Sequence, residues 1–344
     1  MSPGWGKMSA MAQVLLAVDG NSLVHRAYHS QARTGHHTWA VRGLLSQLVT
    51  AVERVDPTAI VVGFDDPETS RRRDTWPQYK AQRSDKLGTL VDQLRHAADV
   101  LCGLGIAVVV PAGLEADDVL ASAARYAGER RATTVIMTSD RDAFSLIDEA
   151  TSVLRIIDGG VEASPMLTPA RLMTMIGIRP DQYRDFAALR GDASDNLPGV
   201  RGIGPKTAAI LLRELGSAQA AFDDVADGGT RVAAAIGAAG ARRLAAAGAR
   251  EAWELNCRVM AMHDDVALGI DLAGGVGCLP LSADAVRTAF VAQRLTWTTS
   301  AAIRVLCHQE MRDAQWPDEP VADWAAGRPR FAPLTPKAQQ PALF

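Results

Sequence analysis

Acidic residues follow three apolar segments of the sequence at matching positions. VLLAV (14–18) runs into Asp19, IVVGF (60–64) into Asp65 and VIMTS (135–139) into Asp140. Such short apolar runs are typical of strands that are covered on both faces, and the carboxyl ends of parallel strands lie along the edge where ligands bind. A single Asp after a strand is usually a turn former or a helix cap. Three at equivalent positions predict a cluster of carboxylates at one edge of a sheet.

Further acids point to the same edge, although each kind also has an ordinary structural use. Acids in the first turn of a helix favour the helix dipole, and Asp is frequent in glycine-bounded turns. These acids are Glu115, Asp117 and Asp118 at the start of a helix expected over 116–127, Asp142 two residues after Asp140, and Asp192 and Asp195 in GDASDNLPG (191–199). With the first three they would form one acidic cleft.

Carboxylates gathered in one cleft require compensation. Two of them ~5 Å apart repel by roughly 3 kcal/mol at an effective dielectric constant of 20, so the cluster needs bound cations or retained protons. Oxygen ligands without a nearby His or Cys favour Mg²⁺ or Mn²⁺ over zinc. Two such ions ~4 Å apart are the standard machinery for hydrolysis of a phosphodiester. The acids therefore predict a two-metal phosphodiesterase acting on nucleic acid.

A basic segment with interleaved aromatic residues follows the Asp65 strand. It reads RRRDTWPQYKAQR (71–83), and its chemistry suits a surface that grips phosphate and stacks on exposed bases. A run of charges is more often a solvated face, but the position directly after Asp65 places this one over the expected cleft. The residues concerned are Arg71, Arg72, Arg73, Lys80 and Arg83, with Trp76 and Tyr79 among them.

A glycine hairpin follows the GDASD acids. In GVRGIGPKTAAILL (199–212), Gly202, Gly204 and Pro205 make a tight turn into a helix. Backbone N–H groups at such a helix start bind phosphate, and Lys206 adds positive charge. Alone, a GxG turn is weak evidence, but its place directly after the acids indicates a phosphate-binding element.

The order of the elements predicts an α/β fold with a mostly parallel sheet, because strands alternate with helices through residue 157. Strands are expected over 14–18, 60–64, 107–110, 134–138 and 152–157, and helices over 40–52 and 116–127. From Thr168 to about Leu306 the pattern becomes helices joined by Gly and Pro turns. A Pro-, Ala- and Gly-rich tail follows Trp316.

Composition excludes several classes of protein. No apolar run approaches the ~20 residues that cross a bilayer, and the N-terminal residues lack a signal peptide's apolar region. A net charge of −3 argues against a protein that coats nucleic acid by bulk charge. The four cysteines are scattered without a CxxC pair, so a reducing cytoplasm is the simplest expectation.

Six ordered segments resemble the 5′ nuclease superfamily, which includes flap endonucleases, bacteriophage 5′ exonucleases and the 5′ nuclease domain of bacterial DNA polymerase I. The resemblance runs from about Val14 to about Thr296, and its last segment is highly specific. The segments are VDGNSLVHRAYH (18–29), VGFD (62–65), RDTWPQYKAQR (73–83), LEADDVLAS (114–122), TSDRDAFSLI (138–147) and GDASDNLPGVRGIGPKTA (191–208).

The resemblance implies roles for these residues. Asp19, Asp65, Glu115 and Asp117 would bind a first metal ion with Asp118 close by, and Asp140, Asp142, Asp192 and Asp195 would serve a second. Lys80, Arg83, Arg73 and Tyr79 would line a helical arch that holds the scissile phosphate. The residues that would contact DNA are Arg72, Gly202, Gly204, Lys206 and Thr207. The backbone carbonyl groups in 199–208 are candidate ligands of a K⁺ ion. Arg72 stands where polymerase-linked members usually carry Phe.

The resemblance also implies a domain plan. We expect a disordered N-terminus (1–11), a PIN-like α/β nuclease core (12–167) with an arch at about 68–100, a helical DNA-binding part (168–312) with a helix–three-turn–helix element at about 183–216, and a flexible tail (313–344). The protein would be a stand-alone bacterial member, monomeric, cytoplasmic and associated with the nucleoid. It would cut 5′ flaps, nicks and 5′ ends of DNA in replication and repair.

Two other functions remain open at this point. One is a non-catalytic protein that binds branched DNA, although such a protein would be expected to have lost carboxylates. The other is a PIN-type ribonuclease with the same sheet and acids, against which the glycine hairpin argues.

The last residues form a separate pattern. Gln340, Leu343 and Phe344 resemble the short peptide by which bacterial replication proteins dock on the DNA sliding clamp, where Leu and Phe fill an apolar pocket. The simpler alternative is that these residues have no partner or pack on the nuclease itself. The sliding clamp is therefore a candidate partner.

Overall fold

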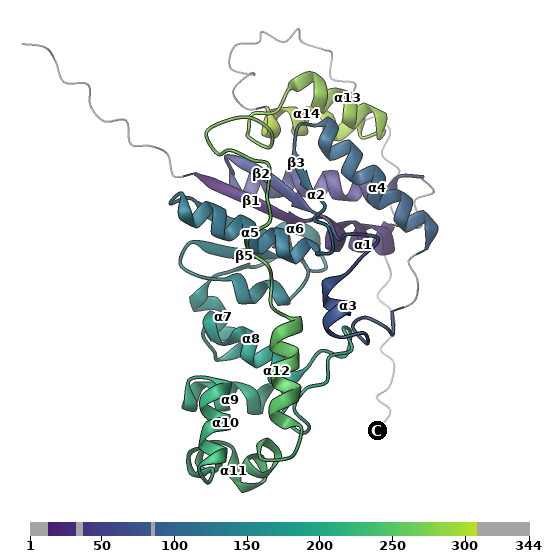
Figure 1. The fold of residues 1–344 in the computed structure, drawn as a ribbon. Helices are drawn as coiled ribbons and strands as arrows, with labels where there is room; N and C mark the ends of the chain where they lie inside the picture. Colours follow the sequence, from purple (N-terminus) through teal and green to yellow (C-terminus); the bar gives the residue numbers. More distant parts are fainter. Residues whose placement is uncertain (1–12, 32–36, 84–86, 308–344) are drawn as a thin grey trace, which may run out of the picture.

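The structure is a computed structural model that describes residues 13–31, 37–83 and 87–307 (Figure 1). The expectations for residues 1–11 and 313–344, including the clamp peptide, lie outside these ranges. No helix in the described ranges is long and apolar enough to cross a membrane.

A six-stranded sheet with the order β3-β2-β1-β4-β5-β6 forms the centre of the α/β part. The first five strands in this order are parallel, so the predicted α/β class is confirmed. The antiparallel β6 was not predicted, because two residues are too few to give a pattern. The strands are β1 (Val14–Asp19), β2 (Ala59–Gly63), β3 (Ala107–Val109), β4 (Thr133–Thr138), β5 (Thr151–Arg155) and β6 (Met166–Leu167).

Side chains of the sheet alternate between two hydrophobic cores. On β1, Leu16 and Val18 pack with α1 (Gly20–Gln31), α2 (Trp39–Val55) and α4 (Gly88–Gly103). Leu15 and Ala17 face the other way and pack with α5 (Ala116–Glu129). All four side chains are fully buried, as expected for a central strand covered on both faces. The sheet edge that carries Asp19 is thus held rigidly from both sides.

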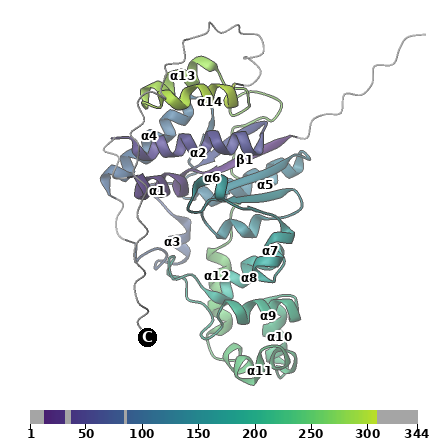
Figure 2. The ribbon, with the colours of Figure 1, turned by 180° about the vertical axis from the view of Figure 1, so that it is seen from behind.

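A helical part extends the α5 core away from the sheet. Tyr183 packs on Phe144 with ring centroids 5.3 Å apart, and the same core continues into α9 and α10. Figures 1 and 2 show α9, α10 and α11 at the end of the molecule opposite to α13 and α14. The helices are α6 (Gly160–Ala163), α7 (Pro169–Ile176), α8 (Tyr183–Arg190), α9 (Pro205–Leu215), α10 (Ala218–Ala226), α11 (Thr230–Leu244) and α12 (Ala249–Val259), with 3₁₀ turns η2 (Asp142–Leu146) and η3 (Pro180–Gln182).

The C-terminal helices do not join that helical part. After α12 the chain returns to the sheet, where Cys278 forms an isolated antiparallel β-bridge with Ala59. Helix α14 (Thr296–Leu306) then packs on α2, and α13 (Ala283–Ala292) packs on α14 and α4. Val286 and Phe290 of α13 lie fully buried in the core of α1 and α2. The expected assignment of 168–312 to one helical unit therefore fails for its last third, because helical periodicity does not reveal which face of the fold a helix covers.

The region expected to form an arch, at about 68–100, contains α3 (Arg71–Thr75) and most of α4. Helix α4 buries Leu90, Ala97 and Leu101 in the core of α1 and α2. The part of the region from Gly88 onward is therefore a core helix, and α3 with the turns up to Arg83 is the segment that faces the acids.

Candidate active site

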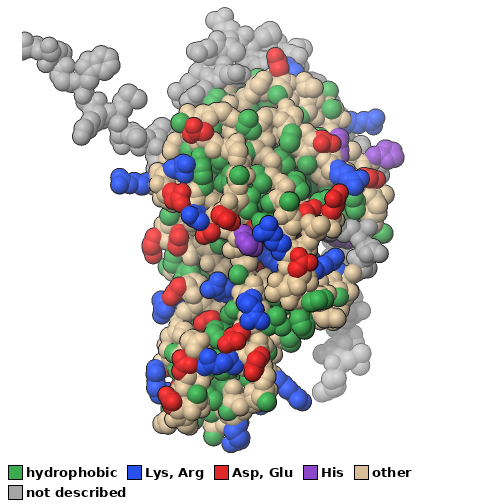
Figure 3. All heavy atoms as spheres, viewed as in Figure 1, with side chains coloured by type: hydrophobic (Ala, Val, Ile, Leu, Met, Phe, Trp, Pro, Cys, Tyr) green, Lys and Arg blue, Asp and Glu red, His purple; other side chains and the backbone are tan. Residues whose placement is uncertain are grey.

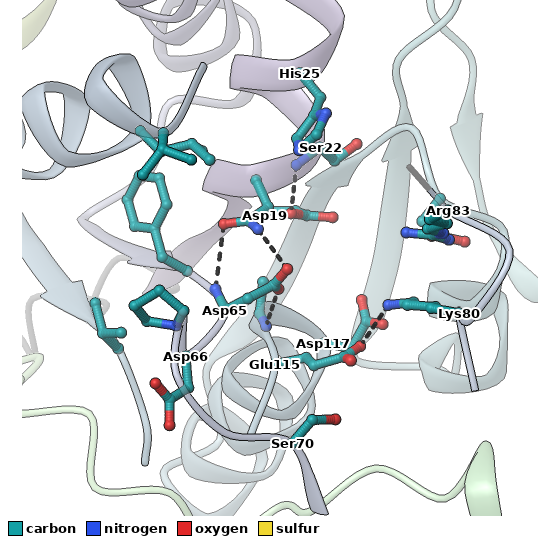
Figure 4. A pocket seen from close by; sticks show the side chains of 18 of the residues that line it. Asp19, Ser22, His25, Asp65, Asp66, Ser70, Lys80, Arg83, Glu115 and Asp117 are labelled. Atoms are coloured by element: carbon teal, nitrogen blue, oxygen red, sulfur yellow. Dashed lines mark hydrogen bonds and ion pairs between the residues drawn. The ribbon is translucent and has the colours of Figure 1, made fainter. Parts of the chain in front are cut away.

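A cleft of about 1200 Å³ opens at the carboxyl ends of the strands (Figure 4). Acidic and basic side chains from distant parts of the sequence meet in its walls. The predicted acids that line it are Asp19, Asp65, Glu115, Asp117 and Asp140, and the bases of the 71–83 segment that line it are Arg73, Lys80 and Arg83. The structure thus brings together most of the residues that the sequence assigned to one site.

Asp19 and Asp65 lie side by side at the ends of neighbouring strands (Figure 4). The Asp19 carboxylate accepts hydrogen bonds from the Ser22 N–H (2.8 Å) and the Thr138 hydroxyl (2.7 Å). Asp65 accepts from the Asn21 amide and, at 3.1 Å, from the Ala116 N–H. Burial, with additional repulsion from Asp65 and Asp140, raises the pKa of Asp19 to about 7. This wall of the cleft therefore favours a bound positive charge.

The acids after β4 and in the GDASD loop form a second group. Asp140 accepts a hydrogen bond from the Asp142 N–H at 3.0 Å. Burial and the charges of Asp140, Asp195 and Asp192 raise the pKa of Asp142 to about 7. The pKa of Asp195 is also raised, chiefly by burial. Since Asp140 raises the pKa of both Asp19 and Asp142, the two groups form one electrostatic unit.

Glu115 is the acid most fully compensated by bases. Its Oε2 accepts hydrogen bonds from Arg72, from Lys80 Nζ at 2.8 Å and from the Tyr79 hydroxyl at 3.1 Å. Burial by itself would raise the pKa of Glu115. The positive charges of Arg72 and Lys80 have the larger effect, so the pKa is lowered. Asp117, two residues on, has a pKa well above its ordinary value because of burial and Asp140.

Asp118, which was expected close to the first metal ion, differs from the neighbouring acids because the protein encloses it. It is 1% exposed, and its two oxygens accept backbone N–H groups of Glu115 and His263, both at 2.8 Å. The first bond belongs to the capping box of α5, and the second fastens the segment after α12. Through these two bonds Asp118 fixes the start of α5 and thereby positions Glu115 and Asp117. Its own side chain points elsewhere, because successive residues of a helix differ in direction.

Lys80 and Arg83 extend from a segment fixed to the GDASD loop. The Lys80 N–H donates to the Asp195 carbonyl at 3.0 Å, and the Arg83 guanidinium pairs with the Asp195 carboxylate. Lys80 has a φ of 54°, in the left-handed region. Such a conformation costs about 1–2 kcal/mol in a non-glycine residue and is frequent at functional sites. Figure 4 shows both bases across the cleft from Asp19 and Asp65.

The two aromatic residues of this segment, Trp76 and Tyr79, are not positioned to stack on bases. Tyr79 is 3% exposed and packs against Leu197 and Val259, and the Trp76 indole N–H donates to the Asn196 carbonyl at 3.0 Å. Both anchor the segment to the loop that carries Asp195. Tyr79 therefore does not line the large cleft, but its hydroxyl reaches Glu115 from the small core under Lys80.

Arg72 also departs from its expected role of DNA contact. Its side chain is 12% exposed and lies among Glu115, Asp117 and Asp118, at 3.7 Å from Asp117 and 3.5 Å from Asp118. It does not line the large cleft but a small second cavity with Asp117, Asp142 and Asp195. Helix α3 turns Arg72 inward and Arg73 toward the cleft.

The glycine hairpin lies between α8 and α9, whose bounds agree with the element expected at about 183–216. Gly202 has a φ of 82°, which glycine adopts without strain. Gly204 caps α9, Lys206 is exposed and Thr207 is half-buried on its first turn. The Gly202 carbonyl accepts from Arg243 of α11 at 3.1 Å. Sequence reasoning did not find Arg243, whose low-complexity surroundings gave no signal.

Asn21 is a second residue that sequence reasoning missed. Besides donating to the Asp65 carboxylate, its carbonyl oxygen accepts the Asp65 N–H at 3.2 Å. It lies two residues after Asp19 in the VDGN segment, so its position close to the first acid was the available signal.

The donor set fits a hard divalent cation. The clustered acids offer oxygen donors, with His25 and His29 also lining the cleft. The pKa values of Asp19, Asp117 and Asp142 are raised by burial and by neighbouring carboxylates, whose repulsion such a cation would relieve. Within the described residues, however, no three His, Cys, Asp or Glu side chains are gathered closely enough around one point to hold an ion as they stand. Arg72 and Lys80 instead bridge the acids, so ion binding requires side-chain rotation.

Two family models match the chain in succession. One, described as 5′-3′ exonuclease, N-terminal resolvase-like domain, matches residues 14–177, and the other, described as 5′-3′ exonuclease, C-terminal SAM fold, matches residues 178–276. The chain belongs to the 5′-3′ exonuclease family. Its two matched parts meet at the end of α7, so the first model covers the sheet and the second the hairpin.

Relatives of this exonuclease family include bacterial polymerases. DNA polymerase I of Mycobacterium tuberculosis is 38% identical over 217 residues, which are 61% of this chain and 24% of that protein. The thermostable DNA polymerase I of Thermus aquaticus is 35% identical over 274 residues, 78% of this chain and 29% of that protein. The chain spans only about a quarter of the length of these polymerases.

Solved structures share the fold at low sequence identity. T5 5′-exonuclease with bound divalent metal ions (zinc) has a TM-score of 0.60 and 20% identity, covering 86% of this chain and all of that one. The catalytic core of Rad2 with DNA substrate has a TM-score of 0.53 and 15% identity over 86% and 91% of the two chains. Human GEN1 with Holliday junction DNA has a TM-score of 0.55 and 16% identity over 86% and 71%.

Proposed function

We propose that the chain is a metal-dependent 5′ nuclease that hydrolyses phosphodiesters at 5′ flaps, nicks and 5′ ends of DNA and releases short products with a 5′-phosphate. The observation that carries the proposal is that the acids after β1, β2 and β4 and those of α5 line one cleft, and that Asp117 also lines a small cavity with Asp142 and with Asp195 of the GDASD loop. Electrostatic coupling through Asp140 links the two groups.

The acids divide into two ligand sets in this proposal. Mg²⁺ or Mn²⁺ ions, two or more, would supply charge neutralisation and an activated water. The first set is Asp19, Asp65, Glu115 and Asp117, and the second is Asp140, Asp142, Asp192 and Asp195. Asp192 is held for this role by the Ser194 N–H at 2.8 Å.

Lys80, Arg83 and Arg73 hold the scissile phosphate in the cleft. Lys80 Nζ and Glu115 are partners at 2.8 Å, so the ammonium group lies within reach of any phosphate that approaches the acids. Positive charge fixed next to a phosphate stabilises the transition state more than the bound ground state. Lys80 is therefore assigned to catalysis and Arg83 and Arg73 to orientation.

The hairpin holds the duplex beside the cleft. Gly202 and Gly204 let a phosphate approach the backbone, and Lys206 and Thr207 lie at the start of α9. Solved relatives of the same fold hold DNA, which supports DNA as the substrate. The carbonyl groups of the hairpin are also proposed to bind a K⁺ ion. Any such ion would share this region with Arg243, which already donates to the Gly202 carbonyl.

A cleavage assay with matched flaps tests the proposal. Labelled 5′-flap DNA and an RNA flap of the same sequence are incubated with the protein, with Mn²⁺ or with EDTA. We expect Mn²⁺-dependent cleavage of the DNA flap. Binding without cleavage in Mn²⁺ would favour a non-catalytic reader of branched DNA, and preferred cleavage of the RNA flap would favour a ribonuclease; either result overturns the proposal.

We further propose that the protein acts as a cytoplasmic, nucleoid-associated monomer that visits the sliding clamp through Gln340, Leu343 and Phe344. Burying Leu and Phe supplies roughly 3–6 kcal/mol before ordering costs, so micromolar affinity is expected. Titration of the clamp with a peptide of residues 333–344 measures it. Unchanged clamp binding after the double substitution Leu343→Ala and Phe344→Ala would contradict the proposed clamp interaction.

A further inference from the structure

Arg72 is a basic residue in an unusual place. Its guanidinium is largely buried among three acids, next to Glu115 and within 3.7 Å of Asp117 and 3.5 Å of Asp118. A buried arginine of this kind is an ion-pair partner rather than a contact for solvent or ligand, because its planar fork is saturated by carboxylates.

The local structure fixes Arg72 in this position. The Arg71 N–H donates to the Gly113 carbonyl at 2.9 Å, which ties the start of α3 to the loop before α5. Ser70 caps the helix through the Arg73 N–H, and the Arg72 carbonyl accepts the Trp76 N–H at 2.9 Å. Since Trp76 is itself bonded to the Asn196 carbonyl, the helix is held at both ends.

Arg72 and Lys80 share Glu115 but differ in where they lie. Lys80 lines the large cleft, whereas Arg72 lines the small cavity behind it together with Asp117, Asp142 and Asp195. Lys80 can therefore meet a phosphate in the cleft. Arg72 can meet only the acids themselves.

We propose that Arg72 is a built-in counter-cation of the acidic cluster, which competes with a divalent metal ion for the carboxylates of Glu115 and Asp117 and thereby weakens metal binding at that end of the cleft. This inference rests on the proposed function, because it concerns the metal requirement of the same site. A metal ion that takes Glu115 and Asp117 as ligands must share them with a fixed positive charge or displace it. The Asp19 and Asp65 end, which Arg72 does not contact, keeps its full attraction for a cation.

The charge balance of the cluster supports this assignment. Glu115 accepts hydrogen bonds from both Arg72 and Lys80, and the Arg72 guanidinium also lies 3.7 Å from Asp117 and 3.5 Å from Asp118. The guanidinium thus already provides part of the compensation that a metal ion would provide. The protein is therefore expected to fold stably with less help from metal than a cluster of uncompensated acids would need.

Calorimetric titration of the full chain with Mn²⁺ tests the inference. Arg72→Met removes the charge but keeps a side chain of similar length, and we expect its dissociation constant for Mn²⁺ to fall about tenfold. Arg72→Lys keeps the charge and is expected to bind Mn²⁺ like the parent protein. Arg71→Met is the matched control, because it removes one positive charge from the same helix without touching the acids, and its dissociation constant should stay within about twofold.

A second readout separates competition from loss of structure. In EDTA the Tm of Arg72→Met should lie below that of the parent, and the gain in Tm on adding Mn²⁺ should exceed the parent's gain. If Arg72→Met does not fold, Arg72→Gln, which keeps an amide donor for Glu115, takes its place with the same expectations.

The outcomes are distinguishable. An unchanged or raised dissociation constant in Arg72→Met, or Arg72→Lys binding as tightly as Arg72→Met, overturns the inference and leaves the proposed function standing. A parent protein that binds no Mn²⁺ overturns both.

Discussion

The acidic cleft and the glycine hairpin (199–208) handle charge in opposite ways. In the cleft, charged groups are buried: Asp19 is 4% exposed and Asp195 8%. Their pKa values are raised, chiefly by burial. In the hairpin, Lys206 is exposed, and backbone groups carry much of the polarity. On the face shown in Figure 3, basic and acidic side chains are intermixed, without a broad field of one sign.

The contrast indicates a division of labour. Buried, mutually repelling charges store electrostatic energy that a cation can release, which suits chemistry. Exposed charges and backbone N–H groups give salt-dependent affinity, which suits binding. Substitutions in the cleft should therefore change turnover, and substitutions in the hairpin should change affinity.

Replacing Asp140 should have the largest effect, because its charge acts on both Asp19 and Asp142. We expect Asp140→Ala to lower single-turnover cleavage of a 5′ flap by at least about 10³-fold, with flap affinity changed by less than about fivefold. Asp264→Ala is the matched control, since that exposed acid lies in a loop after α12 and pairs with the exposed Arg125 of α5. Cleavage by Asp140→Ala at the parent rate would remove Asp140 from the machinery.

Lys80→Ala should affect turnover nearly as strongly. Loss of the ammonium group is expected to lower kcat by roughly 10²-fold while flap affinity changes by less than tenfold, because the charge acts mainly in the transition state. Pre-steady-state cleavage and equilibrium binding measure the two quantities separately. A large loss of affinity with normal turnover would make Lys80 a docking residue and would blur the contrast between the two regions.

How far these regions were predictable from sequence depends on the scale of the feature. The strands that end at Asp19 and Asp65 were located to within a residue or two, because burial on both faces leaves a continuous apolar run. The separate roles of Asp117 and Asp118 were not predictable, because neighbouring helical positions differ by about 100° in direction and only the packing of the segment after α12 decides which acid is enclosed.

The same limit applies to the basic segment. Arg72 and Arg73 are the same residue type at adjacent positions, and a five-residue helix turns one into the acids and the other into the cleft. Residues 168–306 were expected to form helices joined by turns, but the packing of α14 on α2 depends on contacts more than two hundred residues apart in sequence. Local pattern identifies an element, whereas tertiary contacts decide its neighbours.

The pH dependence of stability should report the buried acids of the cleft. Asp19 and Asp142 each have a folded-state pKa of about 7, raised from an ordinary value near 4. Between these values each of the two acids binds more protons in the folded protein than in the unfolded chain, so the stability that they contribute is greatest at low pH and is lost as pH rises through 7.

Thermal unfolding in EDTA measures this effect. We expect the Tm to fall by several degrees between about pH 5 and pH 7.5, and Mn²⁺ to reverse the fall. The double variant Asp19→Asn and Asp142→Asn should show a flatter profile. A Tm that rises with pH in EDTA, or a double variant with the parent's slope, would contradict the assigned burial of charge.

The hairpin should give the smallest effect. Lys206→Ala is expected to weaken flap binding by about three- to tenfold and to reduce the slope of log affinity against log salt by about one, with turnover at saturation unchanged. Arg213→Ala, at the other end of α9 and paired with Glu214, is the matched control. A fall in saturated turnover in Lys206→Ala would show that the hairpin takes part in chemistry.

The central claim, that the acids of five chain segments form one metal site, is tested most directly by an anomalous difference map from crystals soaked in Mn²⁺. The account predicts a peak among Asp19, Asp65 and the Glu115–Asp117 pair, and a further peak beside Asp140, Asp142 and Asp195. Peaks confined to surface carboxylates or to the hairpin, with the cleft empty at saturating Mn²⁺, would contradict it.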